Sequence, residues 1–393
     1  MKHINLPKGQ REVLKLIGEL AKKLKYTVYL VGGPVRDLLL GRTSQDIDIV
    51  CVGDAIKLAK KFRRKVKGEL IIHYDFPNAT VKFYDGKIDF VTARSEKYPK
   101  RKVDLPKVEK TKDIVVDLKR RDFTFNAIAC DLSPNNFCNL VDPFGGLKDC
   151  EKRLIRVLHP NSFKEDPTRI FRAIRFKKEL EFNFEQDTEK YLKRHLKYLR
   201  ELKHERLWKE IRLCLQNGSS VLRLLNEYRV LHVLKLNYPA DTFIERVDIG
   251  SVQFGVDSVN TYILALTENK RPNSLKFDSK FIQQMKYIRQ INNKKLLNVE
   301  IVHELFKLED YSLLYLFGKF PDNSIIIENF FDNRDDLKSE LSGKDIKDIG
   351  VKEGPEVGKI LNKIIEGRWI GKITSKEDEI ELVMKYIGVD NDS

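Results

Sequence analysis

The sequence is poor in cysteine and has no long apolar run. Its five cysteines include no CxxC pair, so they predict neither a disulfide framework nor a zinc site; they are Cys51, Cys130, Cys138, Cys150 and Cys214. No uncharged apolar stretch approaches the ~18 residues of a membrane span. Charges interrupt the apolar positions of residues 1–25, so no secretory leader is predicted. These absences exclude secreted and membrane proteins and predict a cytoplasmic protein with reduced thiols.

Acidic residues are fewer than basic ones: 58 Asp and Glu stand against 73 Lys and Arg, a formal net charge of +15. A net charge of +7 lies between Lys148 and Arg212. Cations that neutralise phosphates release counterions, so the excess favours a polyanionic partner. A solvated lysine-rich surface is the alternative interpretation of the same total.

The 393 residues suffice for two to four domains, and the first third predicts mixed α and β structure. Apolar residues at helical spacing predict helices over 10–24 and 54–65. Short β-branched runs predict a largely antiparallel set of strands at 27–31, 46–50, 69–74, 79–84, 87–93, 127–132 and 138–142.

The connections and the remainder of the chain have a different character. YDGK at 84–87 predicts a two-residue hairpin. Residues 97–117 are polar, hold two prolines and have no clear period, so they predict a long mobile loop. After Gly146 the pattern is helical almost to the end. The predicted fold class is therefore α+β, with a mixed head followed by an α-helical extension.

A glycine pair opens the first candidate site. A predicted strand runs into Gly32 and Gly33, where the backbone can approach a ligand closely, and a helix is expected to begin at Pro34. A helix N-terminus favours anions, and Arg36 adds positive charge in the first turn. The segment therefore predicts phosphate binding. It lacks both GxGxxG and the Walker lysine, so neither a dinucleotide fold nor a P-loop is predicted.

Asp46 and Asp48 lie two apart on a predicted strand, so their side chains share one face. Asp89 lies on a nearby predicted strand. Carboxylates on a rigid strand suit Mg²⁺, which prefers one or two carboxylates plus substrate phosphates. The three residues predict a two-metal phosphoryl-transfer site. An exposed strand with solvated aspartates is the alternative.

A third group lies in DLKRRDFTFNAIA at 117–129. The planar donor fork of Arg121 matches phosphate, so Arg121 is a candidate triphosphate clamp. Asp122 is a candidate to orient an arginine or the sugar hydroxyls, and Asn126 to hydrogen-bond the ribose or a phosphate. A surface charge pair before a strand is the alternative for this segment alone.

The fourth group begins the helix expected after Pro167. Asp166, Arg169, Arg172 and Arg175 are spaced three apart and predict one polar stripe. Cytosine and adenine each present an amino group beside a ring nitrogen that accepts a hydrogen bond. A carboxylate beside a guanidinium would match that edge and would reject uracil and guanine, which present the reverse order. An intrahelical salt-bridge ladder is the alternative.

In these segments the chain resembles the class II tRNA nucleotidyltransferases, that is, the CCA-adding enzymes and their bacterial poly(A) polymerase relatives of the DNA polymerase β-like superfamily. The matching motifs are GGPVRDLLLG with DIDIV, DLKRRDFTFNAIA, DPFGGLKD and EDPTRIFRAIRF, with ELKHERLWKEI at 201–211 as a weaker fifth. The segment 341–361 resembles part of the family's tail. The resemblance implies a catalytic head at 1–145, a base-recognising neck at 146–215, a body at 216–300 and a tRNA-binding tail at 301–393.

The resemblance also implies residue roles. Asp46 and Asp48 would hold Mg²⁺, with Asp89 as the third acidic position. By the resemblance, Gly33 and Arg36 would contact the nucleotide phosphates and Arg121 the triphosphate or sugar. Asp166 and Arg169 would read the base, and Arg172 and Arg175 would support that pocket. The residues themselves add Gly32, Asp122 and Asn126 to the predicted nucleotide-binding set.

The implied activity is addition of CMP and/or AMP, from CTP and ATP, to the tRNA 3′ end. The loop at 97–117 is not shortened, which in this family favours an enzyme that adds the terminal A. No histidine is followed by Asp, so an additional HD hydrolase activity is not expected. Three alternatives remain: an enzyme that adds A only, a poly(A) polymerase, and a catalytically silent RNA-binding protein. No obligatory protein partner is expected.

Overall fold

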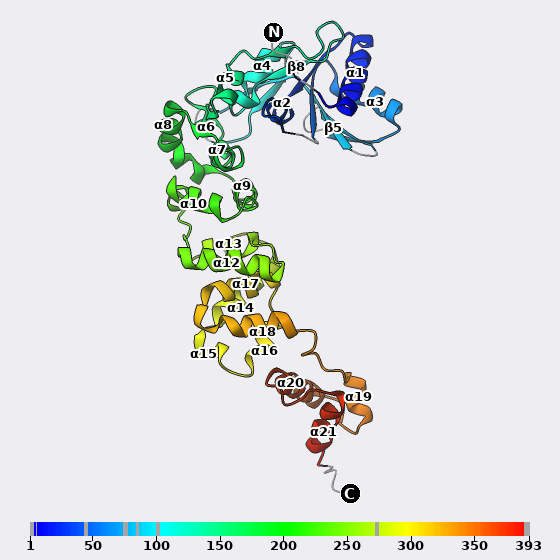
Figure 1. Ribbon diagram of the computed structural model, residues 1–393, viewed down its shortest axis with the longest axis vertical. Coiled ribbons are helices and arrows are strands. Elements are labelled where there is room, and N and C mark those ends of the chain that lie inside the picture. The colour runs from blue at the N-terminus through cyan, green and yellow to red at the C-terminus, as the bar shows by residue number, and fades with distance from the viewer. Residues whose placement is uncertain are drawn as a thin grey trace. The chain divides into compact units, whose positions relative to one another are not determined.

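The structure is a computed structural model that describes residues 4, 6–42, 46–73, 78–83, 86–99, 103–271 and 275–388. The chain divides into two compact units, Met1–Leu234 and Lys235–Ser393 (Figure 1). The first unit contains the predicted head and neck. The finer division into head, neck, body and tail stays a prediction.

The head is built on a seven-stranded sheet with the order β3-β4-β5-β2-β1-β8-β9. Its strands are β1 (Thr27–Val31), β2 (Ile47–Val52), β3 (Glu69–His73), β4 (Asn78–Phe83), β5 (Gly86–Thr92), β8 (Ala129–Asp131) and β9 (Leu140–Val141). Only β2 and β5 pair in parallel; the other neighbours are antiparallel. The prediction of a largely antiparallel sheet is confirmed. The tip of the predicted 84–87 hairpin lies outside the described residues, although Phe83 and Gly86 pair across it.

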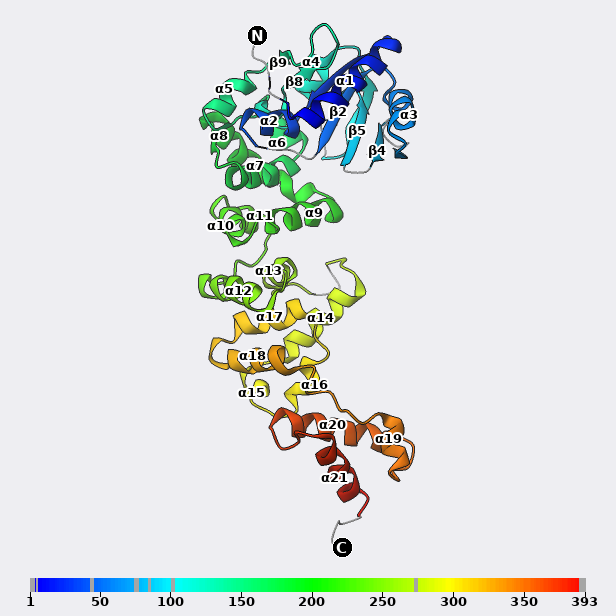
Figure 2. The ribbon, with the colours of Figure 1, turned by 45° about the vertical axis from the view of Figure 1, so that its right-hand side comes forward.

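Two helices cover one face of this sheet, α1 (Lys8–Lys23) and α3 (Ala55–Val66) (Figure 2). The α3 helix begins where the Asp54 side chain accepts a hydrogen bond from the Lys57 amide. Its buried Phe62 packs against the rings of Phe83 and Phe90. Burying such apolar side chains holds the sheet in register, because a one-residue slip would turn them to the opposite face.

The prediction of one long loop over 97–117 is wrong for half of its described residues. Strands β6 (Arg94–Lys97) and β7 (Lys107–Lys110) form an antiparallel ribbon, and α4 (Ile114–Lys119) follows. Residues 100–102 of the predicted loop lie outside the described ranges. The ribbon escapes detection because its cross-strand contacts are ionic, as between Lys97 and Glu109 at 2.9 Å, so it has no apolar alternation. The six-residue α4 is too short to show a period.

The rest of the first unit is mostly helical. It contains α5 (Gly146–Glu151), α6 (Ser162–Glu165), α7 (Thr168–Glu179), α8 (Gln186–His195), η2 (Leu196–Glu201), α9 (His204–Leu215), α10 (Ser219–Glu227) and α11 (Val230–Val233). A short parallel pair, β10 (Leu154–Ile155) with β11 (Asn183–Phe184), interrupts the predicted helical run. Four buried rings join α7 to the segment before β8: Phe123, Phe125, Phe176 and Phe182.

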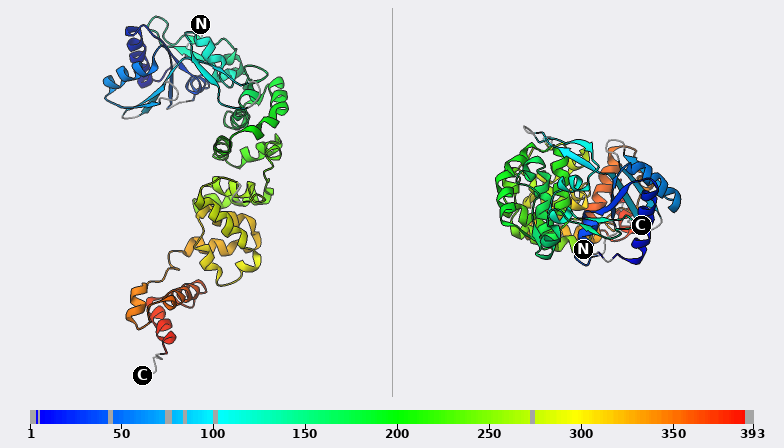
Figure 3. Two further views of the ribbon diagram at one scale, coloured as in Figure 1. Left: turned by 180° about the vertical axis from the view of Figure 1, so that it is seen from behind. Right: turned by 90° about the horizontal axis from the view of Figure 1, so that it is seen from above.

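The second unit contains only helices among its described residues, drawn from yellow-green to red in Figure 3. They are α12 (Asp241–Phe254), α13 (Val259–Leu266), α14 (Ser279–Gln290), α15 (Asn293–Leu296), α16 (Ile301–Leu305), α17 (Asp310–Lys319), η4 (Pro321–Asn323), α18 (Ser324–Asn333), α19 (Gly343–Asp348), α20 (Pro355–Trp369) and α21 (Lys376–Tyr386). Helices α12 and α17 pack closely, since a Cβ at Gly250 would lie 2.8 Å from a Leu314 methyl carbon. Within the described ranges, every helix is too short or too polar to cross a bilayer.

Candidate active site

Three carboxylates gather at neighbouring strands of the sheet. In the parallel ladder of β2 and β5, Asp48 lies directly opposite Asp89. Asp46 immediately precedes β2, so the strand begins one residue later than the sequence predicts. The parallel pairing of β2 and β5 therefore places carboxylates from two separate motifs side by side.

The electrostatics of this cluster favour an incoming cation. Burial raises the pKa of Asp48 to about 6; Arg121 opposes the shift, while Asp89 and Asp46 add to it. Lys87 Nζ lies 3.3 Å from Asp46 Oδ1, and the Thr80 hydroxyl donates to Asp89 Oδ1. A divalent cation would relieve the repulsion that Asp48 experiences.

The donor chemistry also suits a hard cation. The described residues contain no group of three or more His, Cys, Asp or Glu side chains arranged to hold a metal ion, so these residues would supply only one or two ligands. Mg²⁺ commonly binds through one or two carboxylates and takes its other oxygens from water and substrate phosphates. Asp46 and Asp48 fit that coordination pattern.

The glycine turn lies against Arg121, whose side chain is 17% exposed. Gly32 has φ +76°, and a Cβ there would lie 2.9 Å from Arg121 Nη1. Arg121 donates to Asp117 Oδ2 at 3.3 Å, and its buried Nε has no hydrogen-bond partner in the described part of the chain. Burial lowers the pKa of Arg121, whereas Asp117 and Asp48 oppose the shift. A largely buried guanidinium with an unused donor, beside a turn formed by a glycine, can bind an anion.

Arg36 is already engaged in this structure. Its Nη1 donates to Asn126 Oδ1 at 3.0 Å, and its Nε donates to Asp37 Oδ1 at 2.9 Å. The guanidinium is buried and lies 5.2 Å from the centre of the Phe176 ring. Direct phosphate contact by Arg36 stays a prediction, and the sequence analysis did not identify Asp37 as its partner.

Asp122 connects the head to α7. Its Oδ1 accepts from Asn126 Nδ2 at 3.0 Å, and its Oδ2 accepts from Arg172 Nε at 2.8 Å. Burial alone would raise the pKa of Asp122, but Arg172 and the Asn126 hydrogen bond hold it at about 2. Arg36, Asn126, Asp122 and Arg172 thus form one chain of contacts that joins three of the predicted motifs.

Asp166 lies two residues before α7 and Arg169 lies in its first turn, but each has another partner. Arg169 is buried and donates to Ser162 Oγ at 2.6 Å and to the Arg120 carbonyl at 2.7 Å. Asp166 Oδ1 accepts from Arg206 Nη2 at 3.0 Å. The predicted direct pair is therefore absent among their described contacts, and a shared role in base recognition stays a prediction.

The two remaining arginines of α7 lie beside Phe176. The guanidinium carbons of Arg172 and Arg175 lie 5.5 and 5.7 Å from the centre of its ring. Arg175 is also 3.9 Å from Glu179. The ring and its surrounding cations fix the direction in which these long side chains extend.

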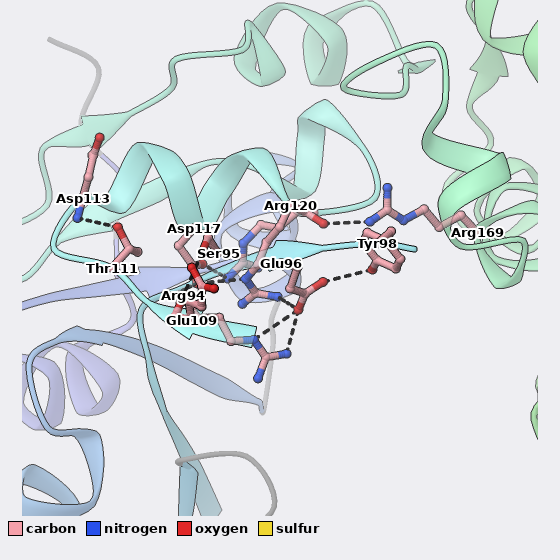
Figure 4. A network of polar contacts seen from close by, with 11 residues as sticks. Arg94, Ser95, Glu96, Tyr98, Glu109, Thr111, Asp113, Asp117, Arg120 and Arg169 are labelled. Carbon is pink, nitrogen blue, oxygen red and sulfur yellow. Dashed lines mark hydrogen bonds and ion pairs between the residues drawn. The ribbon is translucent and has the colours of Figure 1, made fainter. Parts of the chain in front are cut away.

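A polar network that the sequence did not predict contacts the guanidinium of Arg169 and orients it. Figure 4 shows Arg169 reaching from the helical segment to the Arg120 carbonyl beside Tyr98. Arg120 binds Glu96 at 3.1 Å and Asp117 at 3.0 Å, and Tyr98 donates to Glu96 at 3.0 Å. Several of these residues line a cavity of about 400 Å³. Only the ribbon of β6 and β7 brings Glu96 and Tyr98 here, and no sequence pattern predicted that ribbon.

Comparison with known proteins identifies the fold and its family. The family model described as "Poly A polymerase head domain" matches residues 28–156. The A-adding tRNA nucleotidyltransferase of Geobacter sulfurreducens is 29% identical over 97% of this chain, and the chain spans about half (47%) of that relative's length. A solved CCA-adding enzyme in its apo form superposes with a TM-score of 0.86 at 26% identity, covering 98% of this chain and 100% of that one. A tRNA nucleotidyltransferase solved with a primer tRNA and an ATP analogue has a TM-score of 0.66 at 30% identity, covering 82% of this chain and 99% of that one.

The paired carboxylates, the glycine turn and, except for Thr27, the mixed sheet lie within residues 28–156 of the first unit, the part of the chain that matches a poly(A) polymerase head domain. The all-helical remainder matches the rest of the solved CCA-adding fold. The chain belongs to the tRNA nucleotidyltransferase family.

Proposed function

We propose that this protein adds CMP and/or AMP to the 3′ end of tRNA without a nucleic-acid template, releasing pyrophosphate from CTP or ATP. The observation that carries the proposal is the in-register pairing of Asp48 with Asp89 close to Arg121. A protein that only binds RNA has no use for carboxylates facing a polyanion. The relatives' names supply the substrate class.

The residues of the head would orient the reacting phosphate. Arg121 and the backbone at Gly32 and Gly33 would bind the triphosphate, and Asp46 and Asp48 would hold Mg²⁺, with Asp89 beside them. When bound, Mg²⁺ lowers the pKa of an attacking hydroxyl and neutralises charge on the leaving pyrophosphate. Asp122 would hold Arg172 and Asn126 in place around the nucleotide.

Base selection is assigned to α7. Asp166 would accept the exocyclic amino group of cytosine or adenine, and Arg169 would donate to the adjacent ring nitrogen. The positions of Arg172 and Arg175 beside Phe176 support that pocket. Uracil and guanine present the opposite order of donor and acceptor, so their polar groups would be left unpaired.

The proposal includes addition of the terminal A, because the segment 97–117 is not shortened. Tyr98 of this segment lies beside the proposed base-selecting residues, with its ring centre 5.9 Å from the guanidinium carbon of Arg169. An enzyme that adds A only is the second candidate, favoured by the name of the Geobacter relative. A poly(A) polymerase acting on other RNA 3′ ends is a further alternative. We place the protein in the cytoplasm, in keeping with its five buried, unbridged cysteines.

Incorporation of labelled CTP or ATP into tRNAs that end at the discriminator base, at C or at CC tests the proposal. Addition of two C and one A supports a CCA-adding enzyme, and addition to CC ends alone supports an A-adding one. Products longer than one completed CCA end would support poly(A) polymerase. No incorporation on any of the three tRNAs would refute the proposal.

A further inference from the structure

The α9 helix has no role in the function proposed above, although part of it resembles a fifth motif. It packs against α7. Two charged residues of α9, Arg206 and Glu210, are four positions apart and so lie on the same side of the helix. Both approach charged residues of the segment 166–175, where base selection is proposed.

Arg206 is the ion-pair partner of Asp166. Its Nη2 lies 3.0 Å from Asp166 Oδ1, and the two side chains are 31% and 19% exposed. The same oxygen also accepts from the Thr168 amide at 3.2 Å and from the Thr168 hydroxyl at 2.7 Å. Within the described ranges, every hydrogen bond and ion pair of this carboxylate goes to Oδ1. The remaining oxygen, Oδ2, is the acceptor left for a ligand.

Glu210 continues the charge pattern one turn further along α9. Burial raises its pKa, while Arg172 and Arg175 oppose the shift. Its buried Oε2 has no hydrogen-bond partner among the described residues. Thus α9 places the positive charge of Arg206 beside Asp166 and the carboxyl group of Glu210 near the two arginines. The charges of α9 therefore complement those of the segment 166–175. This complementarity fixes how α9 faces α7.

We propose that Arg206 is a positioning residue for base selection, and this inference rests on the proposed function. By holding Oδ1, Arg206 and Thr168 orient Asp166 so that Oδ2 alone accepts the exocyclic amino group of cytosine or adenine. A fixed carboxylate oxygen repels the carbonyl that uracil or guanine places there. Without Arg206, only the neighbouring Thr168 orients the carboxylate, and the distinction between amino group and carbonyl weakens.

The experiment compares Arg206→Ala and Arg206→Lys with Lys209→Ala, an exposed lysine on the same helix. Single-nucleotide incorporation into tRNA gives kcat and KM for each of the four nucleotides, and thermal denaturation gives Tm. We expect Arg206→Ala to raise KM for the correct nucleotide and to lower discrimination against UTP and GTP on the order of tenfold, with a smaller change in kcat. Arg206→Lys should recover part of the discrimination, and Lys209→Ala should match the wild type.

Two results would overturn the inference. One is an Arg206→Ala variant that has a lower Tm, or a kcat lowered equally for all four nucleotides, and keeps its discrimination against UTP and GTP. That is the result expected of a purely structural role. The other is a lower KM in Arg206→Ala, which would mean that the ion pair competes with the nucleotide. Should Arg206→Ala not fold, Arg206→Met keeps the aliphatic stem and supports the same comparison. A wild type that adds neither AMP nor CMP refutes the proposed function as well, whereas an active wild type with an unchanged Arg206→Ala refutes this inference alone.

Discussion

At the scale of the residue, the head places like charges together at a cost in stability. The folded pKa of Asp48, about 6, lies above its ordinary value of 3.8 because the side chain is buried near Asp89 and Asp46. The folded state therefore binds this proton more tightly than the unfolded state. The resulting stability is present below about pH 4 and is lost as the pH rises through about 6.

Asp48→Asn should consequently be more stable than the wild type at about pH 8, by on the order of 2 kcal/mol, while losing incorporation. The neutral amide avoids both the cost of burying a charge and the repulsion from Asp89 and Asp46. Thermal denaturation without divalent cations, at about pH 8 and about pH 4.5, measures this difference. Equal stability of the two proteins at the higher pH would contradict the electrostatic account.

Gly32 and Gly41 offer a matched pair of substitutions. Both have positive φ, +76° and +72°, but a Cβ at Gly32 meets Arg121 whereas one at Gly41 meets nothing within 4 Å. Each change to Ala should cost about 1 kcal/mol of backbone strain. Only Gly32→Ala should also raise KM for ATP severalfold, because it displaces Arg121. Denaturation and incorporation kinetics check both effects, and equal kinetics in the two variants would contradict the role of Arg121.

At the scale of the element, the β6–β7 ribbon depends on one buried acid. Glu96 binds Arg94, Arg120 and the Tyr98 hydroxyl, and its side chain is 7% exposed. Glu96→Ala should destabilise the protein by about 2 kcal/mol, because it removes the carboxylate that Arg94, Arg120 and the Tyr98 hydroxyl share. Glu109→Ala, which removes an exposed pair with Lys97, should leave Tm unchanged. Similar Tm values for the two variants would contradict this account of the ribbon.

The elements with regular apolar patterns were predictable from sequence, and the polar ones were not. β1 has the predicted bounds of 27–31, and α1 and α3 differ from prediction by one or two residues at each end. The charged ribbon was missed because its stability comes from partners that are distant along the chain. The same reason applies at the site: sequence indicated Asp48, Arg121 and Asp166, but their partners depend on the tertiary fold.

At the scale of the whole molecule, the net charge should govern the proposed interaction with tRNA. The chain carries +15 at pH 7. Affinity for tRNA should therefore fall at least tenfold between about 50 mM and about 200 mM salt, with a linear dependence of log affinity on log salt. Filter binding over that range measures the slope. A slope near zero would contradict phosphate contacts as the main source of affinity.

In the proposed reaction, carboxylates on neighbouring strands hold the metal ions for nucleotidyl transfer to a tRNA end. The most direct measurement is incorporation of labelled AMP into tRNA ending in CC by the wild type, by Asp46→Ala and by Asp48→Ala, with tRNA affinity measured on the same preparations. Both variants should lose incorporation and keep tRNA affinity, because the carboxylates contribute to transfer and not to RNA binding. Incorporation near the wild-type level in either variant would contradict the claim.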